Sequence, residues 1–100
     1  MARKLVITRR AQSDLDEIWE YIAQDSFDAA NRVEDEIHRE IRNLVPFPGK
    51  GHLREDVNDK TLRFWKVYSY LITYRYDDAS LTVVRVIHGA RNIGHMLDRN

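Results

Sequence analysis

Apolar positions in the first half of the chain repeat with the period of an α-helix. Between residues 11 and 22 they are separated by three or four residues, which places them on one helical face. This first stripe contains Leu15, Ile18, Trp19 and Ile22. A longer stripe of the same period follows, made of Ala30, Val33, Ile37, Ile41 and Leu44. The pattern predicts two consecutive helices, each with one apolar face.

The residues that flank these stripes indicate where each helix begins and ends. Thr8 and Ser26 are residue types that cap helix N-termini. Pro46 and Pro48 end the second helix, because proline lacks a backbone N–H and disfavours helical geometry in the residue before it. The break at Asp25-Ser26 is short, so we expect an antiparallel helical hairpin.

From Leu62 to Arg91 the pattern becomes that of β-strands. Aromatic and β-branched residues dominate, and two polar breaks, at Ser69 and at Asp77–Ser80, divide the run into three. Three consecutive strands with short turns predict an antiparallel meander. Lys4–Thr8 is a further short strand candidate before the first helix.

Alternation along these strands predicts two different sheet faces. In the second strand of the meander Tyr70, Ile72 and Tyr74 share a face. In the third strand Val84, Val86 and His88 alternate with Val83, Arg85 and Ile87. Basic residues recur at Arg63, Lys66, Arg75 and Arg85. We therefore expect a curved sheet with basic side chains on one surface and an apolar face on the other.

Together these elements predict one α+β domain over residues 1–100, with the order β-α-α-β-β-β. An N-terminal strand is followed by a helical hairpin that packs its apolar stripes on the curved antiparallel sheet. Eight side chains of the hairpin should be largely buried there: Leu15, Ile18, Trp19, Ile22, Val33, Ile37, Ile41 and Leu44. Residues 46–60 lack periodicity and are expected to form a long loop, a frequent place for functional residues.

Composition narrows the possible classes of protein. A hydrophobic content of 43% over 100 residues is typical of a folded domain. No cysteine is present, and the histidines at 38, 52, 88 and 95 lack metal-ligand spacing, so we expect neither a metal nor another cofactor. No apolar run approaches the roughly 18–20 residues of a membrane helix. No signal peptide is evident, so a cytoplasmic protein is expected.

The zero net charge conceals an uneven distribution. Residues 11–45 carry three arginines against ten acids, and the remainder of the chain holds an equal excess of positive charge. Acids on the solvated faces of two helices are unremarkable. Positive charge gathered on strands and loops favours an anionic or acidic partner.

One group of basic residues has the composition of a phosphodiester-binding site. Lys50, His52 and Arg54 lie in the long loop, and Arg63, Arg85, His88 and Arg91 lie on or beside the strands. If they converge, His88 is placed to transfer a proton while arginines stabilise developing charge. The alternative is that these residues are surface charges that pair with an acidic partner or with Glu55 and Asp56.

Several segments, in this order, resemble the toxins of the RelE/ParE superfamily, and specifically the ParE branch. The first is Ala11-x-x-Asp14-Leu15-x-x-Ile18-Trp19-x-Tyr21-Ile22, followed in the loop by Pro48-Gly49-x-Gly51-His52 with Arg54. The sheet contributes Leu62-Arg63-Phe64-Trp65-x-Val67-x-Ser69-Tyr70-Leu71-Ile72-x-Tyr74-Arg75 and Arg85-Val86-Ile87-His88-Gly89-Ala90-Arg91. Where the family commonly has an aspartate after the last arginine, this chain has Asn92.

The resemblance implies a type II toxin–antitoxin system and a ParD-type antitoxin whose extended segment wraps the toxin. For that partner we expect pairing with Arg63, Arg75 or Arg85. ParE-branch toxins poison DNA gyrase, which implies a protein that is not an enzyme. The alternatives are a RelE-type ribosome-dependent mRNA endonuclease using His88, Arg85, Arg63, Arg54, Lys50 and Arg91, or an inactive homologue that only binds antitoxin.

Overall fold

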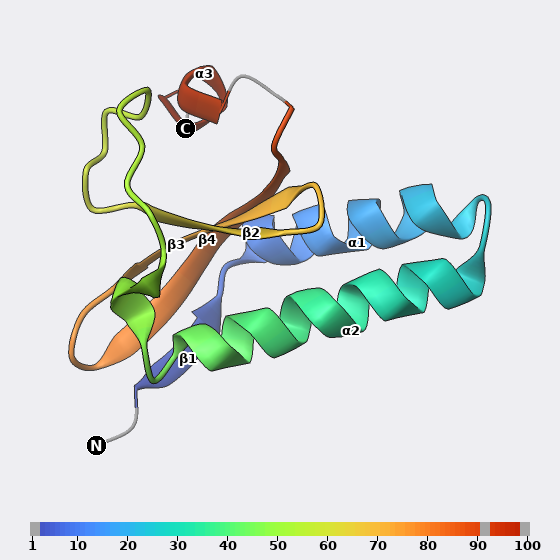
Figure 1. Ribbon diagram of the computed structural model, residues 1–100, viewed down its shortest axis with the longest axis horizontal. Coiled ribbons are helices and arrows are strands. Elements are labelled where there is room, and N and C mark those ends of the chain that lie inside the picture. Colours follow the sequence, from blue (N-terminus) through green and yellow to red (C-terminus); the bar gives the residue numbers. More distant parts are fainter. Residues whose placement is uncertain (1–2, 91–92, 99–100) are drawn as a thin grey trace.

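The computed structural model describes residues 3–90 and 93–98 (Figure 1). The elements follow the predicted order: β1 (Lys4–Ile7), α1 (Arg9–Ala23), α2 (Phe27–Leu44), a short 3-10 turn η1 (Pro48–Lys50), β2 (Arg63–Val67), β3 (Tyr70–Tyr76), β4 (Ser80–His88) and α3 (Ile93–Asp98). The predicted α+β fold and its hairpin are therefore confirmed. None of the described helices is long and apolar enough to span a membrane.

The four strands form one sheet in the order β1-β4-β3-β2. β2, β3 and β4 are the predicted antiparallel meander, paired by Trp65 with Ile72 and by Ile72 with Val86. β1 joins the edge of β4 and runs parallel to it, with Leu5 beside Leu81. The sheet is therefore mixed, with β1 and β4 as its parallel pair. Parallel neighbours need a long connection, and here all the elements from α1 to β3 lie between the two strands in the chain.

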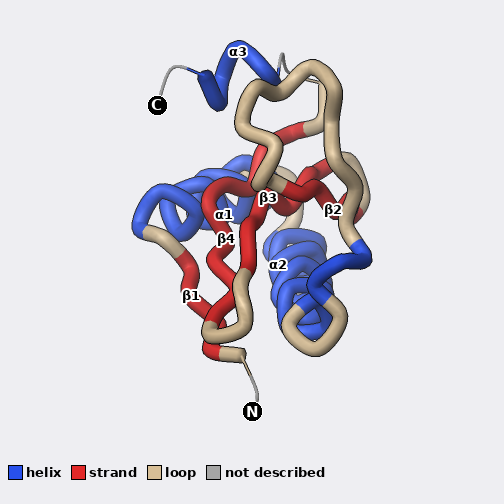
Figure 2. The backbone as a smooth tube through the Cα atoms, turned by 90° about the vertical axis from the view of Figure 1, so that its left-hand side faces the viewer, coloured by secondary structure: helices blue, strands red, loops and turns tan. Residues whose placement is uncertain are grey.

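Both predicted N-caps begin a helix. The Thr8 hydroxyl oxygen accepts a hydrogen bond from the N–H of Ala11, and the Ser26 hydroxyl oxygen accepts one from the N–H of Ala29. Each bond satisfies one of the donors that a helix start leaves unpaired. α2 ends at Leu44, before the two prolines. Figure 1 shows the two helices side by side, and Figure 2 shows strands of the sheet between α2 and α3.

The main core lies between this hairpin and the sheet. Leu15, Ile37, Ile41 and Leu44 are at most 2% exposed. They belong to one cluster with strand residues that point toward the helices, namely Val67, Ile72, Tyr74, Leu81, Val83 and Val86. These four of the eight predicted core residues of the hairpin therefore pack where they were expected.

The other four predicted core residues are only half-buried. Ile18, Trp19, Ile22 and Val33 lie toward the connected end of the hairpin, which projects beyond the strands in Figure 1. The stacked rings of Trp19 and Phe27, with centroids 5.7 Å apart, cover part of that end instead. Helical periodicity predicts which face of a helix is apolar, but the length of the sheet beneath it decides how much of that face is covered.

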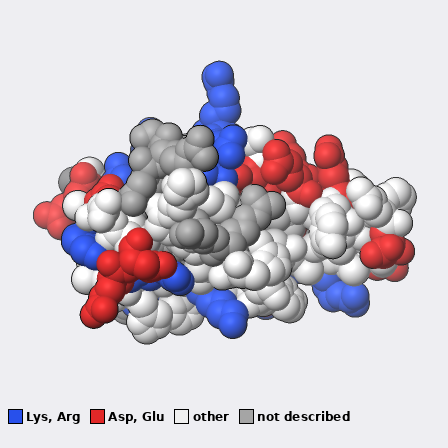
Figure 3. Space-filling model, turned by 90° about the horizontal axis from the view of Figure 1, so that it is seen from above, with Lys and Arg blue, Asp and Glu red and all other residues white. Residues whose placement is uncertain are grey.

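The opposite sheet face is not the open basic surface that alternation predicted. It carries a second apolar cluster, which the 51–62 segment and α3 cover: Val57, Leu62, Phe64, Leu71, Ile87 and Ile93, with Val84, Met96 and Leu97 at its border. α3 packs so closely that a Cβ atom on Gly94 would overlap the carbonyl oxygen of Asp56. Figure 3, which views this side, shows basic and acidic side chains interleaved.

A β-bulge also breaks the alternation predicted for the last strand. Thr73 pairs with Arg85 but Tyr74 pairs with Val83, so Val84 is the extra residue. Val83 and Val86 consequently both belong to the helix-facing core, although strict alternation places them on opposite faces. The bulge shifts the faces by one residue.

Candidate functional site

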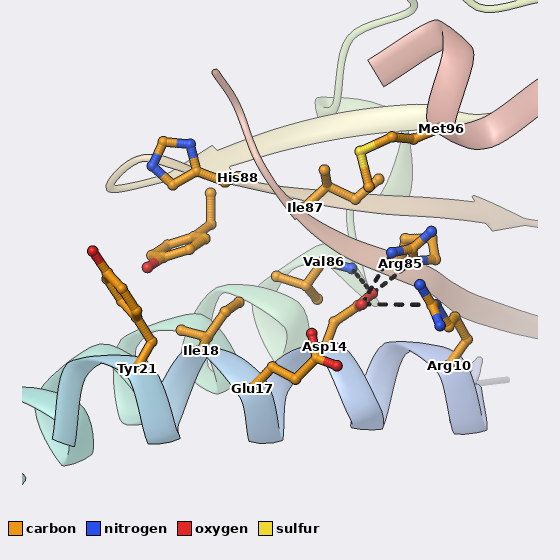
Figure 4. A pocket seen from close by; sticks show the side chains of 11 residues that line it. Arg10, Asp14, Glu17, Ile18, Tyr21, Arg85, Val86, Ile87, His88 and Met96 are labelled. Atoms are coloured by element: carbon orange, nitrogen blue, oxygen red, sulfur yellow. Dashed lines mark hydrogen bonds and ion pairs between the residues drawn. The ribbon is translucent and has the colours of Figure 1, made fainter. Parts of the chain in front are cut away.

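The chain positions its buried charges around this bulge. Asp14 of α1 and Arg85 of β4 are 6% and 4% exposed. The Nε and terminal nitrogen of Arg85 donate to the two Asp14 carboxylate oxygens at 2.8 and 3.1 Å. This two-point geometry is the strongest form of an arginine–carboxylate pair. Figure 4 shows Asp14 directed from α1 toward Arg85, with Arg10 beside them.

The ion pair also satisfies the backbone where β1 ends. Pairing between β1 and β4 stops at Ile7 and Val83, because the chain then enters α1. Beyond that point the Thr8 hydroxyl donates to the carbonyl oxygen of Val84 at 3.0 Å. The Val86 N–H donates to the Asp14 carboxylate at 3.0 Å. Buried backbone groups need hydrogen-bond partners. At the bulge of β4, where no neighbouring strand supplies them, the side chains of Thr8 and Asp14 do so.

A groove with a volume of about 520 Å³ opens beside this pair, between α1 and the end of β4. Its lining is Arg10, Asp14, Glu17, Ile18, Tyr21, Tyr70, Arg85, Val86, Ile87, His88 and Met96. We call it the α1–β4 groove. In Figure 4 Glu17, Ile18 and Tyr21 rise from α1, opposite Ile87 and His88 on the strand and Met96 on α3.

The α1–β4 groove has an apolar floor and a mixed rim. Ile18, Val86 and Ile87 supply aliphatic surface, while Tyr21 is 71% exposed at the rim. Burial, together with the nearby Tyr21 hydroxyl, raises the pKa of Tyr70, so its hydroxyl stays neutral well into the alkaline range. An apolar floor with a few polar groups is suited to bind the side chains of a partner segment.

His88 stands at the end of this groove and borders a second, smaller cavity. Its ring meets that of Tyr70 edge-on, with centroids 5.4 Å apart, and its Nδ1 accepts a hydrogen bond from the N–H of Ala90. The second cavity, about 350 Å³, is lined by Arg54, Lys66, Ser69, Leu71, His88, Gly89 and Ala90. His88 and Arg54 therefore border the same cavity, together with Lys66.

The other basic residues proposed from the sequence do not join that cavity. Arg85 is buried against Asp14, and Arg63 donates to the carbonyl oxygen of Gly51 at 2.9 Å. Lys50 lies over the ring of Trp65, 4.4 Å from its centroid. The expected convergence of these residues on one sheet surface is wrong, because Asp14 of α1 holds Arg85 and local partners hold the others. Arg91 lies outside the described residues.

Two further arginines have carboxylate partners of their own. Arg54 donates two hydrogen bonds to the carboxylate of Asp56, each 2.9 Å long. Arg75 donates one to the carboxylate of Asp59, also at 2.9 Å. The hydrogen bonding between Arg54 and Asp56 lowers the pKa of Asp56 and raises the pKa of Arg54. Arg63, Arg75 and Arg85, which we expected to pair with a partner protein, all have partners within the chain.

Sequence analysis assigned Asp14 to the solvated side of its helix and missed its role. A signal was present, since Asp14 follows Ala11 by three residues and precedes Ile18 by four. An acid at such a position falls on the apolar stripe rather than opposite it. Tyr21 and Met96 were also missed as lining residues, and neither spacing nor residue type marks them.

Comparison with known proteins agrees with this architecture. A family model described as the ParE toxin of the type II toxin–antitoxin system parDE matches residues 5–93. A solved structure titled as the chromosomal ParDE TA system from P. aeruginosa superimposes with a TM-score of 0.73 at 19% identity, over 87% of this chain and 96% of that chain. At this identity the superposition shows a shared fold. A search of curated proteins found no match.

The family match includes both sides of the α1–β4 groove, since α1 and β4 lie within residues 5–93. The match covers most of the chain, and the order of strands and helices is the one that the sequence resemblance implied. The chain therefore belongs to the ParE toxins of type II toxin–antitoxin systems.

Proposed function

We propose that the α1–β4 groove is the place where a ParD-type antitoxin neutralises this toxin. Membership of a toxin–antitoxin family implies such a partner, and the open groove, with aliphatic side chains between polar ones, supports this location for it. An amphipathic segment of the antitoxin would bury its apolar side chains against Ile18 and Val86 and cover Tyr21. Partly exposed aromatic residues of this kind commonly dominate binding energies.

The matched pair Tyr21 and Phe47 tests this location. Each side chain is 71% exposed, but only Tyr21 lines the groove. Tyr21→Ala should weaken antitoxin binding by roughly 1–4 kcal/mol, the range of an interface hot spot. Phe47→Ala should leave it unchanged. Calorimetric titration of purified toxin with antitoxin measures both, and equal affinities for the two variants would place the antitoxin elsewhere.

The target that this arrangement supports best is DNA gyrase, inhibited in the cytoplasm without a catalytic step. The observation that carries this proposal is the burial of Arg85 against Asp14. A nuclease requires several cations around one phosphodiester, whereas here the candidate arginines at 54, 63 and 85 are each bonded within the chain. An inhibitor that acts by binding needs no such convergence.

RNA cleavage remains the second candidate because His88, Arg54 and Lys66 line one cavity. In a nuclease His88→Ala should reduce cleavage about 100-fold or more, as removal of a transition-state group typically does. In a gyrase inhibitor the same variant should be mild, because binding energy is spread over an interface.

Two assays with purified toxin separate these functions. We expect inhibition of gyrase supercoiling while ribosome-bound mRNA stays intact, with His88→Ala close to the unsubstituted toxin. Cleaved message that disappears in His88→Ala, with supercoiling unaffected, would replace gyrase by RNA as the target. Failure in both assays, with antitoxin binding retained, would identify a homologue that only binds antitoxin.

A further inference from the structure

The outer edge of β1 leaves backbone groups without partners. Lys4 N–H donates to the carbonyl oxygen of Ala79 at 2.9 Å, and Thr8 N–H to that of Val83 at 3.1 Å. Because strand residues alternate in direction, the even-numbered residues of β1 bond to β4. The N–H and C=O groups of Leu5 and Ile7 therefore face away from the sheet, and within residues 3–90 and 93–98 no hydrogen bond uses them.

The opposite edge of the sheet is treated differently. There His52 and Phe64 exchange two backbone hydrogen bonds, at 2.9 and 2.8 Å, so the long loop covers part of β2. Proteins normally cover or otherwise protect a sheet edge, because a free edge can pair with another chain. Along β1 the described residues provide no such cover, and Leu5, Val6 and Ile7 are half-buried.

Cations without an internal partner stand at both ends of β1. Lys4 opens the strand and Arg9 follows it; both are exposed, and neither forms an ion pair within the described part of the chain. Arg10 is 3.9 Å from Asp14, whose carboxylate is already held by Arg85. Residues 3–10 contain no acid. This field attracts an acidic chain and opposes a second copy of β1, which would bring like charges together.

We propose that an extended acidic segment of a partner protein adds to the edge of β1 as a fifth strand of the four-stranded sheet. Its backbone pairs with the outward N–H and C=O groups of Leu5 and Ile7. Its carboxylates meet Lys4 and Arg9. Main-chain bonds supply affinity in such strand addition, and side chains select the partner. The proposal goes beyond the α1–β4 groove and does not depend on it.

A synthetic peptide of alternating valine and glutamate with blocked ends is the probe, and a valine–lysine peptide is its control. In NMR titration the acidic peptide should shift the amide signals of Leu5 and Ile7 and slow their hydrogen exchange. The lysine peptide should have no effect. Shifts confined to the groove, equal binding of both peptides, or dimerisation of the protein through β1 would each overturn the proposal.

Two variants separate the backbone contribution from the charge contribution. Leu5→Pro removes an outward N–H while leaving the bonds to β4, and should weaken peptide binding about fivefold, as loss of one hydrogen bond predicts. The double variant Lys4→Gln/Arg9→Gln should weaken binding and reduce its salt dependence, whereas Arg32→Gln on α2 should not. If Leu5→Pro fails to fold, the charge variants decide alone, and unchanged binding in them contradicts the proposal.

The groove variant keeps this test apart from the antitoxin proposal. Tyr21→Ala should bind the acidic peptide at β1 as well as the unsubstituted protein does. Loss of peptide binding in Tyr21→Ala would mean that the peptide occupies the groove and that β1 is not the site. If the protein binds the peptide at β1 but binds no antitoxin in the α1–β4 groove, strand addition at β1 is supported and the proposed antitoxin site is wrong.

Discussion

Asp14 is the buried carboxylate that joins the first helix to the sheet. Its carboxylate accepts two bonds from Arg85 and one from the backbone of Val86, all buried. It joins the first turns of α1 to the bulge of β4, which are 71 residues apart in the chain. A buried ion pair adds little net stability compared with apolar side chains, but removal of one partner leaves the other charge buried alone.

We therefore expect Asp14→Ala to lower the free energy of unfolding by about 3–5 kcal/mol, because Arg85 and the Val86 N–H lose their partner. Asp16→Ala, an exposed acid on the same helix, should change it by less than about 0.5 kcal/mol. Urea titration measures both. A double variant Asp14→Leu/Arg85→Met should recover much of the loss, and no recovery would argue against the ion-pair explanation.

Tyr74 is the second residue whose side chain joins distant segments. Its hydroxyl accepts a hydrogen bond from the N–H of Gly51 at 2.9 Å and donates one to the carbonyl oxygen of Pro48 at 2.5 Å. The ring is completely buried, and a Cβ atom at position 51 would overlap its hydroxyl. Tyr74 therefore fixes the start of the long loop against the sheet, which explains the need for glycine at position 51.

This contact predicts a pH dependence of stability. Burial raises the pKa of Tyr74 above its ordinary value of 10.0, so the folded state favours the neutral hydroxyl. The stability it contributes is complete below pH 10 and is lost as pH rises through the folded-state pKa. Tyr74→Phe should cost about 1–3 kcal/mol at neutral pH, because two buried groups lose their partner, and should flatten the alkaline decline. Urea titrations from pH 7 to 11, with Tyr68→Phe as control, measure this.

At the scale of elements, the helical hairpin is anchored at one end and projects at the other. In the C-terminal half of α2 the side chains of Ile37, Ile41 and Leu44 are completely buried. The half of the hairpin near its connection carries half-buried Trp19, Ile22 and Val33, with Tyr21 and Phe27 exposed. The same helices thus supply a core at one end and a binding surface at the other.

Truncations along the hairpin should reproduce this gradient. Ile41→Ala removes a fully buried side chain and should cost about 2–5 kcal/mol, through lost burial and the cavity left behind. Ile22→Ala makes the same chemical change at the projecting end, where less contact is lost, and should cost clearly less. Thermal unfolding of both variants tests the gradient, and equal losses would contradict it.

At the scale of the molecule, charge is divided between the two layers. Residues 11–45, which form most of the two helices, carry a net charge of −7, and the rest of the chain carries +7. The arginines of the strands are bonded internally, whereas Lys4 and Arg9 beside β1 and Lys66 at the small cavity form no ion pair within the described residues. Such a distribution orients a charged partner during approach more than it adds contact energy.

We therefore expect salt to act on the rate of antitoxin association. Raising the ionic strength from about 0.05 to about 0.5 M should lower the association rate constant severalfold, because screening shortens the reach of the charges. The dissociation rate constant should change much less. Stopped-flow mixing separates the two, and an association rate that does not respond to salt would exclude electrostatic steering.

The sequence by itself determined the elements, because helix caps, apolar periods and β-branched runs act over a few residues. Thr8 and Ser26 cap the two helices as their residue types indicated. The helices and the three meander strands also formed where the local pattern predicted them. The motifs carried by these segments were also sufficient to identify the family, because they are patterns of residue types at fixed spacing. Gly51, which belongs to the loop motif, lies where the loop must approach Tyr74.

Tertiary structure decided which face each strand residue occupies and which charges remain free. One extra residue at Val84 shifted the faces within β4, and the packing of α1 beside this strand made Arg85, expected as a surface cation, the partner of Asp14. The coverage of the outer sheet face by residues 51–62 and α3 likewise depends on contacts between distant segments. These outcomes follow from register and packing across the whole chain, which no local pattern encodes, and they determine both the groove and the open edge of β1.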